Sequence, residues 1–175
     1  VSLIQSIYHD FGSAIIPEKT GVLLQNRGCF FSLNSAHVNR LEPGKRTFHT
    51  LNAAMFFKEG KPFLVCGTMG GEGQPQTQAA IMTRIVDHQF SPQDAIEAPR
   101  CLYGRTWGVD TNNVKLESRI PEDVADALRR WQHSVEMVEP YAHTMGHAGA
   151  ILIDPQTQMQ YGASDPRSDG IAVCY

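Results

Sequence analysis

The chain has 175 residues, 42% of them hydrophobic and 19% charged, so it can bury a core and is expected to form one domain over residues 1–175. Its net charge of −3 and its scattered Lys and Arg residues argue against a nucleic-acid partner, and no apolar run approaches a membrane span of roughly 20 residues. The four cysteines form no C-x-x-C pair, and Gly146 separates His143 from His147, so neither a metal nor a cofactor is expected.

The first half of the chain is predicted to be mostly extended. Residues 1–8 and 20–26 are rich in β-formers and predict two short strands, whereas residues 41–47 predict a loop. Apolar residues 51–57 and 62–66 flank Glu59-Gly60-Lys61, which predicts a β-hairpin. Because neither a methionine nor a signal peptide precedes Val1, the chain looks like a processed product or a fragment, and its localisation stays open.

The second half mixes helices and strands. A helix is predicted over residues 76–88, with Ala79, Ile81, Met82, Ile85 and Val86 on its apolar face. Ser91 as N-cap and Pro92 at the first position predict a second helix that stops before Pro99. A third helix is predicted over residues 121–131, with Val124, Leu128 and Trp131 as its apolar residues. Five strands are predicted at residues 100–103, 114–117, 135–138, 148–153 and 159–163. These elements indicate an α+β fold with largely antiparallel sheets flanked by helices.

A glycine-rich run at residues 67–73 joins the strand at 62–66 to the first predicted helix. Such a junction directs free backbone N–H groups and the positive end of a helix dipole toward one point, where a negative charge is favoured. A phosphate loop would end in Gly-Lys-Ser/Thr, which is absent here. Two interpretations remain: a simple turn, or an oxyanion hole for acyl transfer formed by the N–H groups of Gly70 and Gly71.

An oxyanion hole requires a nucleophile, and the sequence offers none that is convincing. The hydroxyl residues Ser6, Ser13, Thr50 and Thr68 lie in no Gly-x-Ser-x-Gly elbow, and no His/Asp pairing is implied by spacing.

Six ordered motifs resemble the small subunit of γ-glutamyltransferases, over nearly the whole chain. They are Phe11-Gly12-Ser13, the segment 20–26, Pro43-Gly44-Lys45-Arg46 with His49-Thr50-Leu51, the segment 67–71, Ala98-Pro99-Arg100, and the segment 162–167. The resemblance implies an N-terminal-nucleophile (Ntn) hydrolase with an αββα sandwich, this chain being its small-subunit part and a large subunit from the same precursor its partner. It also implies that the nucleophile is a threonine upstream of Val1, which serves as its own base through its α-amino group.

The resemblance assigns roles to individual residues. Gly70 and Gly71 match the oxyanion-hole glycines. His49 and Thr50 fall where the family holds the α-carboxylate of a γ-glutamyl group, although His49 could instead pack beside Phe48. Ser6 matches a threonine thought to assist the nucleophile, and could equally be an ordinary strand serine.

Two departures from the family favour hydrolysis over transfer. The acceptor-binding aspartate of the family falls at Phe30, within Arg27-Gly28-Cys29-Phe30, and Arg27 and Phe30 are taken as further substrate-binding candidates. The stretch 32–41 is also too short for a lid loop. Both features resemble the cephalosporin acylase-like branch of the family, so a small-molecule γ-glutamyl or related amide is expected as substrate.

Two other functions remain open at this point: a true γ-glutamyl transpeptidase of glutathione metabolism, and a catalytically silent homologue or binding module. Arg100, Asp165 and Arg167 are expected to be structural, and Gln74 and Gln76 to cap or line the loop helix.

Overall fold

The structure is a computed structural model that describes residues 1–106 and 111–174. The chain divides into two compact units, Ile4–Leu51 and the remainder, which comprises Val1–Leu3 and Asn52–Tyr175. Within the described ranges, no helix has the length and apolar character needed to cross a membrane.

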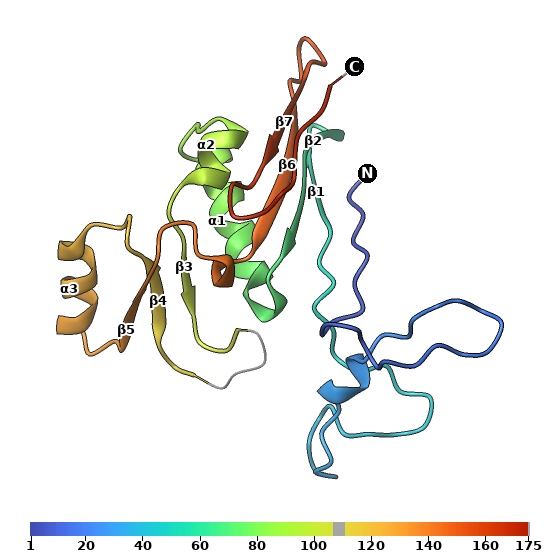
Figure 1. Cartoon of the computed structure of the whole chain (residues 1–175). Coiled ribbons are helices and arrows are strands. Elements are labelled where there is room, and N and C mark those ends of the chain that lie inside the picture. Colours follow the sequence, from blue (N-terminus) through green and yellow to red (C-terminus); the bar gives the residue numbers. More distant parts are fainter. Residues whose placement is uncertain (107–110, 175) are drawn as a thin grey trace. The chain divides into compact units, whose positions relative to one another are not determined.

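The larger unit is organised around a four-stranded antiparallel sheet (Figure 1). Its strands, in the spatial order β1-β2-β6-β7, are β1 (Ala54–Lys58), β2 (Lys61–Met69), β6 (His147–Ile153) and β7 (Gln160–Ser164). The predicted hairpin is confirmed, because β1 and β2 pair with Lys58 opposite Lys61. Glu59 and Gly60 form the turn with φ values of 52° and 77°, the left-handed pair that a tight hairpin requires.

Two helices, α1 (Gln74–Val86) and α2 (Pro92–Glu97), pack against this sheet (Figure 1). Helix α1 starts two residues earlier than predicted, with Gly73 as N-cap and Pro75 in its first turn. The predicted cap of α2 is confirmed, since the side chain of Ser91 accepts a hydrogen bond from the N–H of Asp94.

The core lies between the two helices and the sheet. It is built from small and branched apolar side chains, namely Leu64, Cys66, Ile81, Ile85, Ala95, Ile96, Ala148, Ala150 and Ala163. The predicted apolar face of α1 is right for Ile81 and Ile85 but wrong for Ala79 and Val86, which are exposed. Instead, the buried face of the first turns of α1 carries the polar residues Gln74, Thr77 and Gln78.

A second sheet contains three short strands, β3 (Cys101–Tyr103), β4 (Val114–Glu117) and β5 (Val135–Val138). Strands β3 and β4 are antiparallel, whereas β4 and β5 are parallel because α3 (Glu122–Arg130) makes the crossover between them. Cys101 is exposed on β3.

In the first 51 residues, two predicted strands are wrong. Residues 1–8 and 20–26 form no strand, and the helical turn η1 (Arg27–Phe30) follows the second of these segments. The two segments touch through isolated backbone bonds, such as Asn26 N–H to Ile7 O at 3.2 Å, rather than a continuous ladder. Residues 41–47 are a loop, as predicted.

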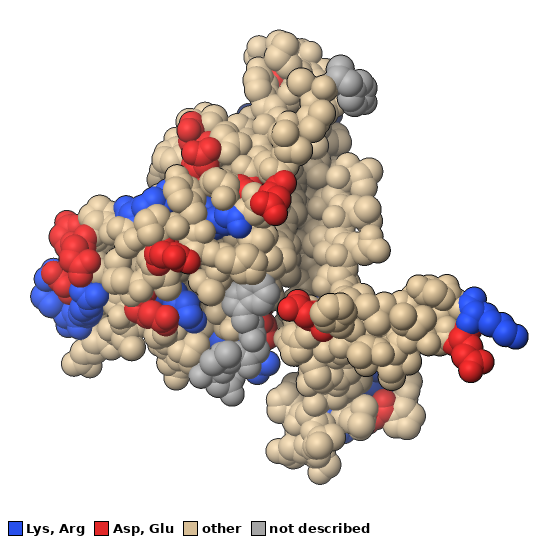
Figure 2. Space-filling model, in the orientation of Figure 1, with Lys and Arg blue, Asp and Glu red and all other residues tan. Residues whose placement is uncertain are grey.

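Charged side chains of both signs are interspersed over the face shown in Figure 2. One end of the larger unit illustrates this, because Arg129 of α3 lies 2.6 Å from Glu122 and 2.9 Å from Asp126.

Candidate active site

The glycine run forms the predicted junction between a strand and a helix. Strand β2 ends at Met69, a helical turn η2 (Gly71–Gly73) follows, and α1 begins at Gln74. Gly70 has φ 151° and Gly71 has φ 53°, conformations that favour glycine. Among the described residues, no acceptor takes a hydrogen bond from the N–H of Gly70 or Gly71. The loop thus presents two adjacent donors, as an oxyanion hole requires.

A third glycine, which the sequence analysis did not single out, fixes the position of this loop. Gly146 follows the helical turn η3 (His143–Met145) and has φ 76°. A Cβ at this position would stand 2.2 Å from the carbonyl oxygen of Met69 and 3.3 Å from Cα of Gly70. Two backbone segments therefore meet here at a distance that only glycine permits.

Buried amides and hydroxyls support the loop from the side of α1. The Thr68 hydroxyl donates to Oε1 of Gln74 at 3.3 Å and accepts from Nε2 of Gln78 at 3.1 Å. The side-chain amide of Gln76 donates to the carbonyl of Tyr103 at 2.9 Å and accepts from the N–H of Tyr103 at 2.8 Å. Both polar atoms of this amide therefore bind the backbone of β3. Gln76 is therefore structural, and Gln74 lines the helix start as expected.

Two histidines lie close to the loop, near Gly146. The rings of His143 and His147 meet edge to face with centroids 4.6 Å apart, and His147 is the β6 partner of Met69. Burial, followed by the neighbouring His143, lowers the pKa of His147. No group of three or more potential metal-ligating side chains is found in residues 1–106 and 111–174.

Arg100, Asp165 and Arg167 form a buried ion network that holds the C-terminal turn, in agreement with the structural role expected for them. Asp165 accepts from Nη2 of Arg100 at 2.5 Å and from Nη1 of Arg167 at 3.0 Å. Arg167 also makes two bonds to the carboxylate of Glu117, at 2.6 and 2.8 Å. Arg100 in turn donates to the carbonyl of Gly146 at 2.8 Å, which links the network to the glycine loop.

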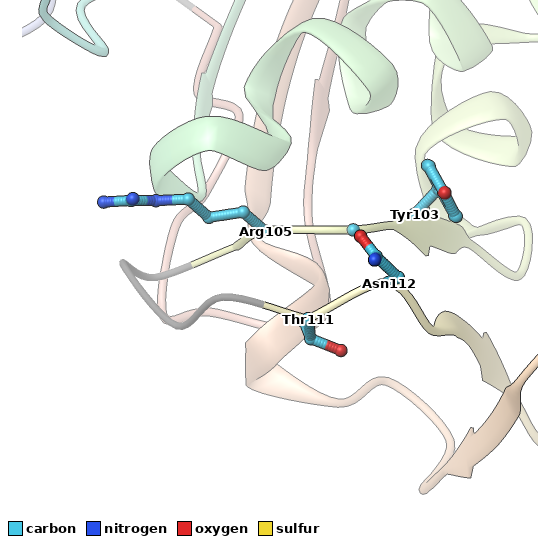
Figure 3. A pocket seen from close by; sticks show the side chains of 5 residues that line it. Tyr103, Arg105, Thr111 and Asn112 are labelled. Carbon is cyan, nitrogen blue, oxygen red and sulfur yellow. The ribbon is translucent and has the colours of Figure 1, made fainter. Parts of the chain in front are cut away.

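An open pocket at the end of β3 contains none of the predicted site residues (Figure 3). It is lined by Tyr103, Gly104, Arg105, Thr111 and Asn112. The side chain of Arg105 points away from Thr111 and Asn112 in Figure 3, and its Nε donates to Glu72 at 3.1 Å. This ion pair connects the segment after β3 to the turn η2.

The unit Ile4–Leu51 brings four of the predicted site residues together, namely Ser6, Arg27, Phe30 and Thr50. The guanidinium of Arg27 donates through Nη1 to the Thr50 hydroxyl at 3.0 Å and through Nη2 to the Ser6 hydroxyl at 2.9 Å. The carbon of the guanidinium also lies 5.4 Å from the centre of the Tyr8 ring. Ser6, Tyr8, Arg27, Phe30 and Thr50 are called the Arg27 cluster below.

Phe30 completes the cluster on its apolar side. Its ring centroid lies 4.5 Å from that of Tyr8 and 5.2 Å from that of Phe48. Residues Arg27 and Phe30 are the first and last of η1, and a 3₁₀ turn brings side chains three apart onto one face. His49 is exposed rather than buried beside Phe48.

The comparisons with known proteins agree on one family. The sequence profile described as gamma-glutamyltranspeptidase matches residues 1–175. The chain is 53% identical over 173 residues to the glutathione hydrolase-like YwrD proenzyme of Bacillus subtilis, covering 99% of this chain and 33% of that protein. It is 48% identical over 176 residues to the oxamate amidohydrolase proenzyme of Klebsiella pneumoniae, covering 100% and 33%.

A solved structure supports the same assignment. The cephalosporin acylase of Bacillus halodurans superposes with a TM-score of 0.88 at 37% identity, over 98% of this chain and 31% of that chain. The α+β Ntn-hydrolase fold is thereby confirmed, as is the resemblance to the hydrolytic, acylase-like members. This chain spans about a third of the length of the curated relatives named above. The chain belongs to the gamma-glutamyltranspeptidase family.

Proposed function

We propose that this chain supplies the oxyanion hole and the acyl-binding residues of an amidohydrolase that works through a threonyl acyl-enzyme. The observation that carries this proposal is the pair of N–H groups at Gly70 and Gly71, which have no acceptor among the described residues and are presented at the start of a helix. Two such donors suit the negative oxygen of a tetrahedral intermediate. A simple turn between β2 and α1 would need neither two left-handed glycines nor the close approach of Gly146.

The nucleophile in this proposal is a threonine located upstream of Val1. Its hydroxyl adds to the amide carbonyl while its own α-amino group takes the proton. The tetrahedral oxyanion accepts hydrogen bonds from Gly70 and Gly71, and its collapse expels the amine, which leaves with that proton. Water then adds to the ester, releases the acid and regenerates the threonine. Each of the two displacements passes through the same oxyanion hole.

The Arg27 cluster and the exposed His49 are proposed to hold the acyl group. Thr50 has the hydroxyl expected at a carboxylate-binding position, and Ser6 takes the position expected for assistance to the nucleophile. Phe30 offers no charge to an amino acid acceptor, so water is the proposed acceptor and hydrolysis the proposed main reaction. The names of the relatives give two kinds of amide to consider, glutathione and oxamate.

A large subunit from the same precursor is the proposed partner. Both named relatives are proenzymes about three times as long as this chain. Several large apolar side chains of the larger unit are strongly exposed in this chain, including Leu3 at 85%, Phe57 at 61% and Trp131 at 73%. An apolar surface of this kind is typical of one that another part of the protein covers.

The test of this function is the N-terminal residue of the mature chain that contains Val1. The intact protein is purified and its chains are sequenced by Edman degradation and mass spectrometry. Threonine at the new N-terminus, together with amide hydrolysis that stops when it is replaced by alanine, would support the proposal. An N-terminal residue other than Thr, Ser or Cys would contradict it and would favour a catalytically silent binding protein.

A further inference from the structure

Glu72 places a negative charge inside the glycine loop. It is the middle residue of η2 and directly follows Gly71, one of the two proposed oxyanion donors. Its side chain is 12% exposed, and its Oε1 accepts a hydrogen bond from Nε of Arg105 at 3.1 Å. The other carboxylate oxygen, Oε2, is buried and has no hydrogen-bond partner among the described residues. Within the described ranges, Arg105 is thus the side chain that compensates this carboxylate.

This charge has the wrong sign for the proposed reaction. Consecutive Cα atoms are about 3.8 Å apart, so the carboxylate of Glu72 lies within roughly 10 Å of the N–H of Gly71. Two negative charges at this separation, which is about one Debye length at physiological salt, are only partly screened from each other. An uncompensated carboxylate would therefore repel an oxyanion bound at Gly70 and Gly71 more than the neutral amide from which that oxyanion forms.

Glu72 also competes for the end of a helix. It precedes Gln74, the first residue of α1, by two positions, and the positive end of the helix dipole favours an acid there. This stabilisation accounts for an acidic residue in the turn without any part in the chemistry. It also means that a bare carboxylate would cancel some of the positive potential on which the oxyanion hole depends. A cation beside Glu72 restores that potential.

Arg105 is held beside the loop by contacts that do not involve charge. The side-chain amide of Gln76 makes two hydrogen bonds with the backbone of Tyr103, at 2.9 and 2.8 Å. A Cβ at Gly73 would stand 3.4 Å from Cγ2 of Thr106, so these two residues approach closely. The segment that carries Arg105 is therefore fixed on both sides of it. Removal of its charge is expected to change the potential at the loop more than the position of the loop.

We propose that Arg105 is a positioning residue that acts through Glu72: it neutralises this carboxylate, so that the N–H groups of Gly70 and Gly71 can stabilise a negative oxygen. This inference rests on the proposed amide hydrolysis. The side chain of Arg105, 47% exposed, acts by its charge and does not touch the reacting atoms.

The kinetic experiment measures kcat and KM of the intact protein for γ-glutamyl-p-nitroanilide and for oxamate. Arg105→Gln should lower kcat by about twofold to twentyfold with little change in KM, because the oxyanion exists only in the transition state and the intermediate. The double variant Glu72→Gln/Arg105→Gln lacks both charges and should have a higher kcat than Arg105→Gln. Glu72→Gln alone should lower kcat less than Arg105→Gln does.

The comparison of the two Arg105→Gln proteins separates charge from structure. Both lack the ion pair, so they share any folding defect and differ only in the charge of residue 72. Arg105→Lys keeps the positive charge and should retain most of the wild-type kcat. Arg129→Gln is the matched control, since it breaks exposed ion pairs with Glu122 and Asp126 on α3 and should leave both kinetic constants unchanged.

Two kinetic results would overturn the inference. One is a kcat of Arg105→Gln equal to that of the wild type. The other is a double variant no faster than Arg105→Gln, which would show that the ion pair is a structural tie alone. Both results leave wild-type hydrolysis intact and so do not affect the proposed function. A wild type that hydrolyses neither amide would overturn the proposed function and this inference with it.

Discussion

Gly146 and Gly70 lie so close that a Cβ on the first would stand 3.3 Å from the Cα of the second. The same Cβ would be 2.2 Å from the backbone oxygen of Met69, which no side-chain movement can relieve. The end of β2 and the start of β6 are therefore held together by a backbone contact. Any displacement of Gly146 is passed directly to the donors of the glycine loop.

Gly146→Ala is expected to disturb the loop and to lower turnover by about tenfold to a hundredfold, because small misplacements of catalytic groups have effects of this size. Steady-state kinetics and the melting temperature are measured together. Gly149→Ala, on the strand β6 that follows Gly146, is the control, since its Cβ would meet only the Ala163 oxygen at an ordinary 3.8 Å. Equal activity in both variants would contradict a role of Gly146 in positioning the loop.

Gly71→Ala tests the oxyanion hole itself. Gly71 has φ 53°, so alanine strains the turn and moves its N–H away from the developing charge. Turnover should fall by about 10²-fold, the usual effect of losing one such donor. Gly60→Ala is matched for strain, with φ 77° and no atom within 4 Å of its Cβ, but lies in the β1–β2 turn. If Gly71→Ala keeps the turnover of Gly60→Ala, the loop is only a turn.

Asp165→Asn is expected to destabilise the larger unit rather than to alter the chemistry directly. The carboxylate is buried and pairs with both Arg100 and Arg167, so its neutral amide leaves Arg100 without its buried counter-charge, whereas Arg167 keeps Glu117. Loss of one partner from a buried pair destabilises by about 3–5 kcal/mol. Urea denaturation of the intact protein measures this. Asp126→Asn, which breaks an exposed pair on α3, should leave the unfolding midpoint nearly unchanged.

Local sequence signals were sufficient for the elements around the glycine loop. An apolar run followed by the glycine-rich run 67–73 predicted β2, the turn and α1, and Ser91 with Pro92 predicted the cap of α2. Each of these signals acts between residues only a few positions apart, so the sequence alone contains the necessary information.

Features that depend on distant contacts were not predicted in the same way. Residues 1–8 have β-formers, yet a strand also needs a neighbour with a continuous ladder, and here only isolated bonds such as Asn26 to Ile7 are made. The contacts of Arg27 join residues 21 and 23 positions apart, so only the family resemblance pointed to Ser6 and Thr50. The close approach of Gly146 to Gly70 likewise exists only in the folded chain.

The lowered pKa of His147 predicts that the folded protein loses stability on mild acidification. Burial, followed by His143, lowers the pKa of His147 in the folded state below the value of about 6.5 for an unfolded chain, although Asp165 opposes this shift. Below pH of about 6.5 the unfolded chain binds more protons than the folded one, so stability falls until the pH passes the folded pKa. Neutral His147 therefore makes its full contribution to the free energy of unfolding only above a pH of about 6.5.

His147→Gln should therefore reduce the drop in melting temperature between pH 7.5 and pH 5. His88→Gln, which replaces an exposed histidine after α1, should keep the wild-type drop. A pH dependence that is identical in the wild type and in His147→Gln would show that other groups control acid stability.

Phe30→Asp should raise transfer to glycylglycine relative to hydrolysis, because a carboxylate at this position can hold the ammonium of an acceptor. Arg27, which like Phe30 lies against the Tyr8 ring, would partly neutralise that carboxylate. The double variant Phe30→Asp/Arg27→Gln is therefore expected to show a higher transfer ratio than Phe30→Asp alone. Both products of γ-glutamyl-p-nitroanilide are quantified with and without glycylglycine. Phe48→Asp places the same charge on a neighbouring ring, and an equal ratio in that control would remove Phe30 from the acceptor site.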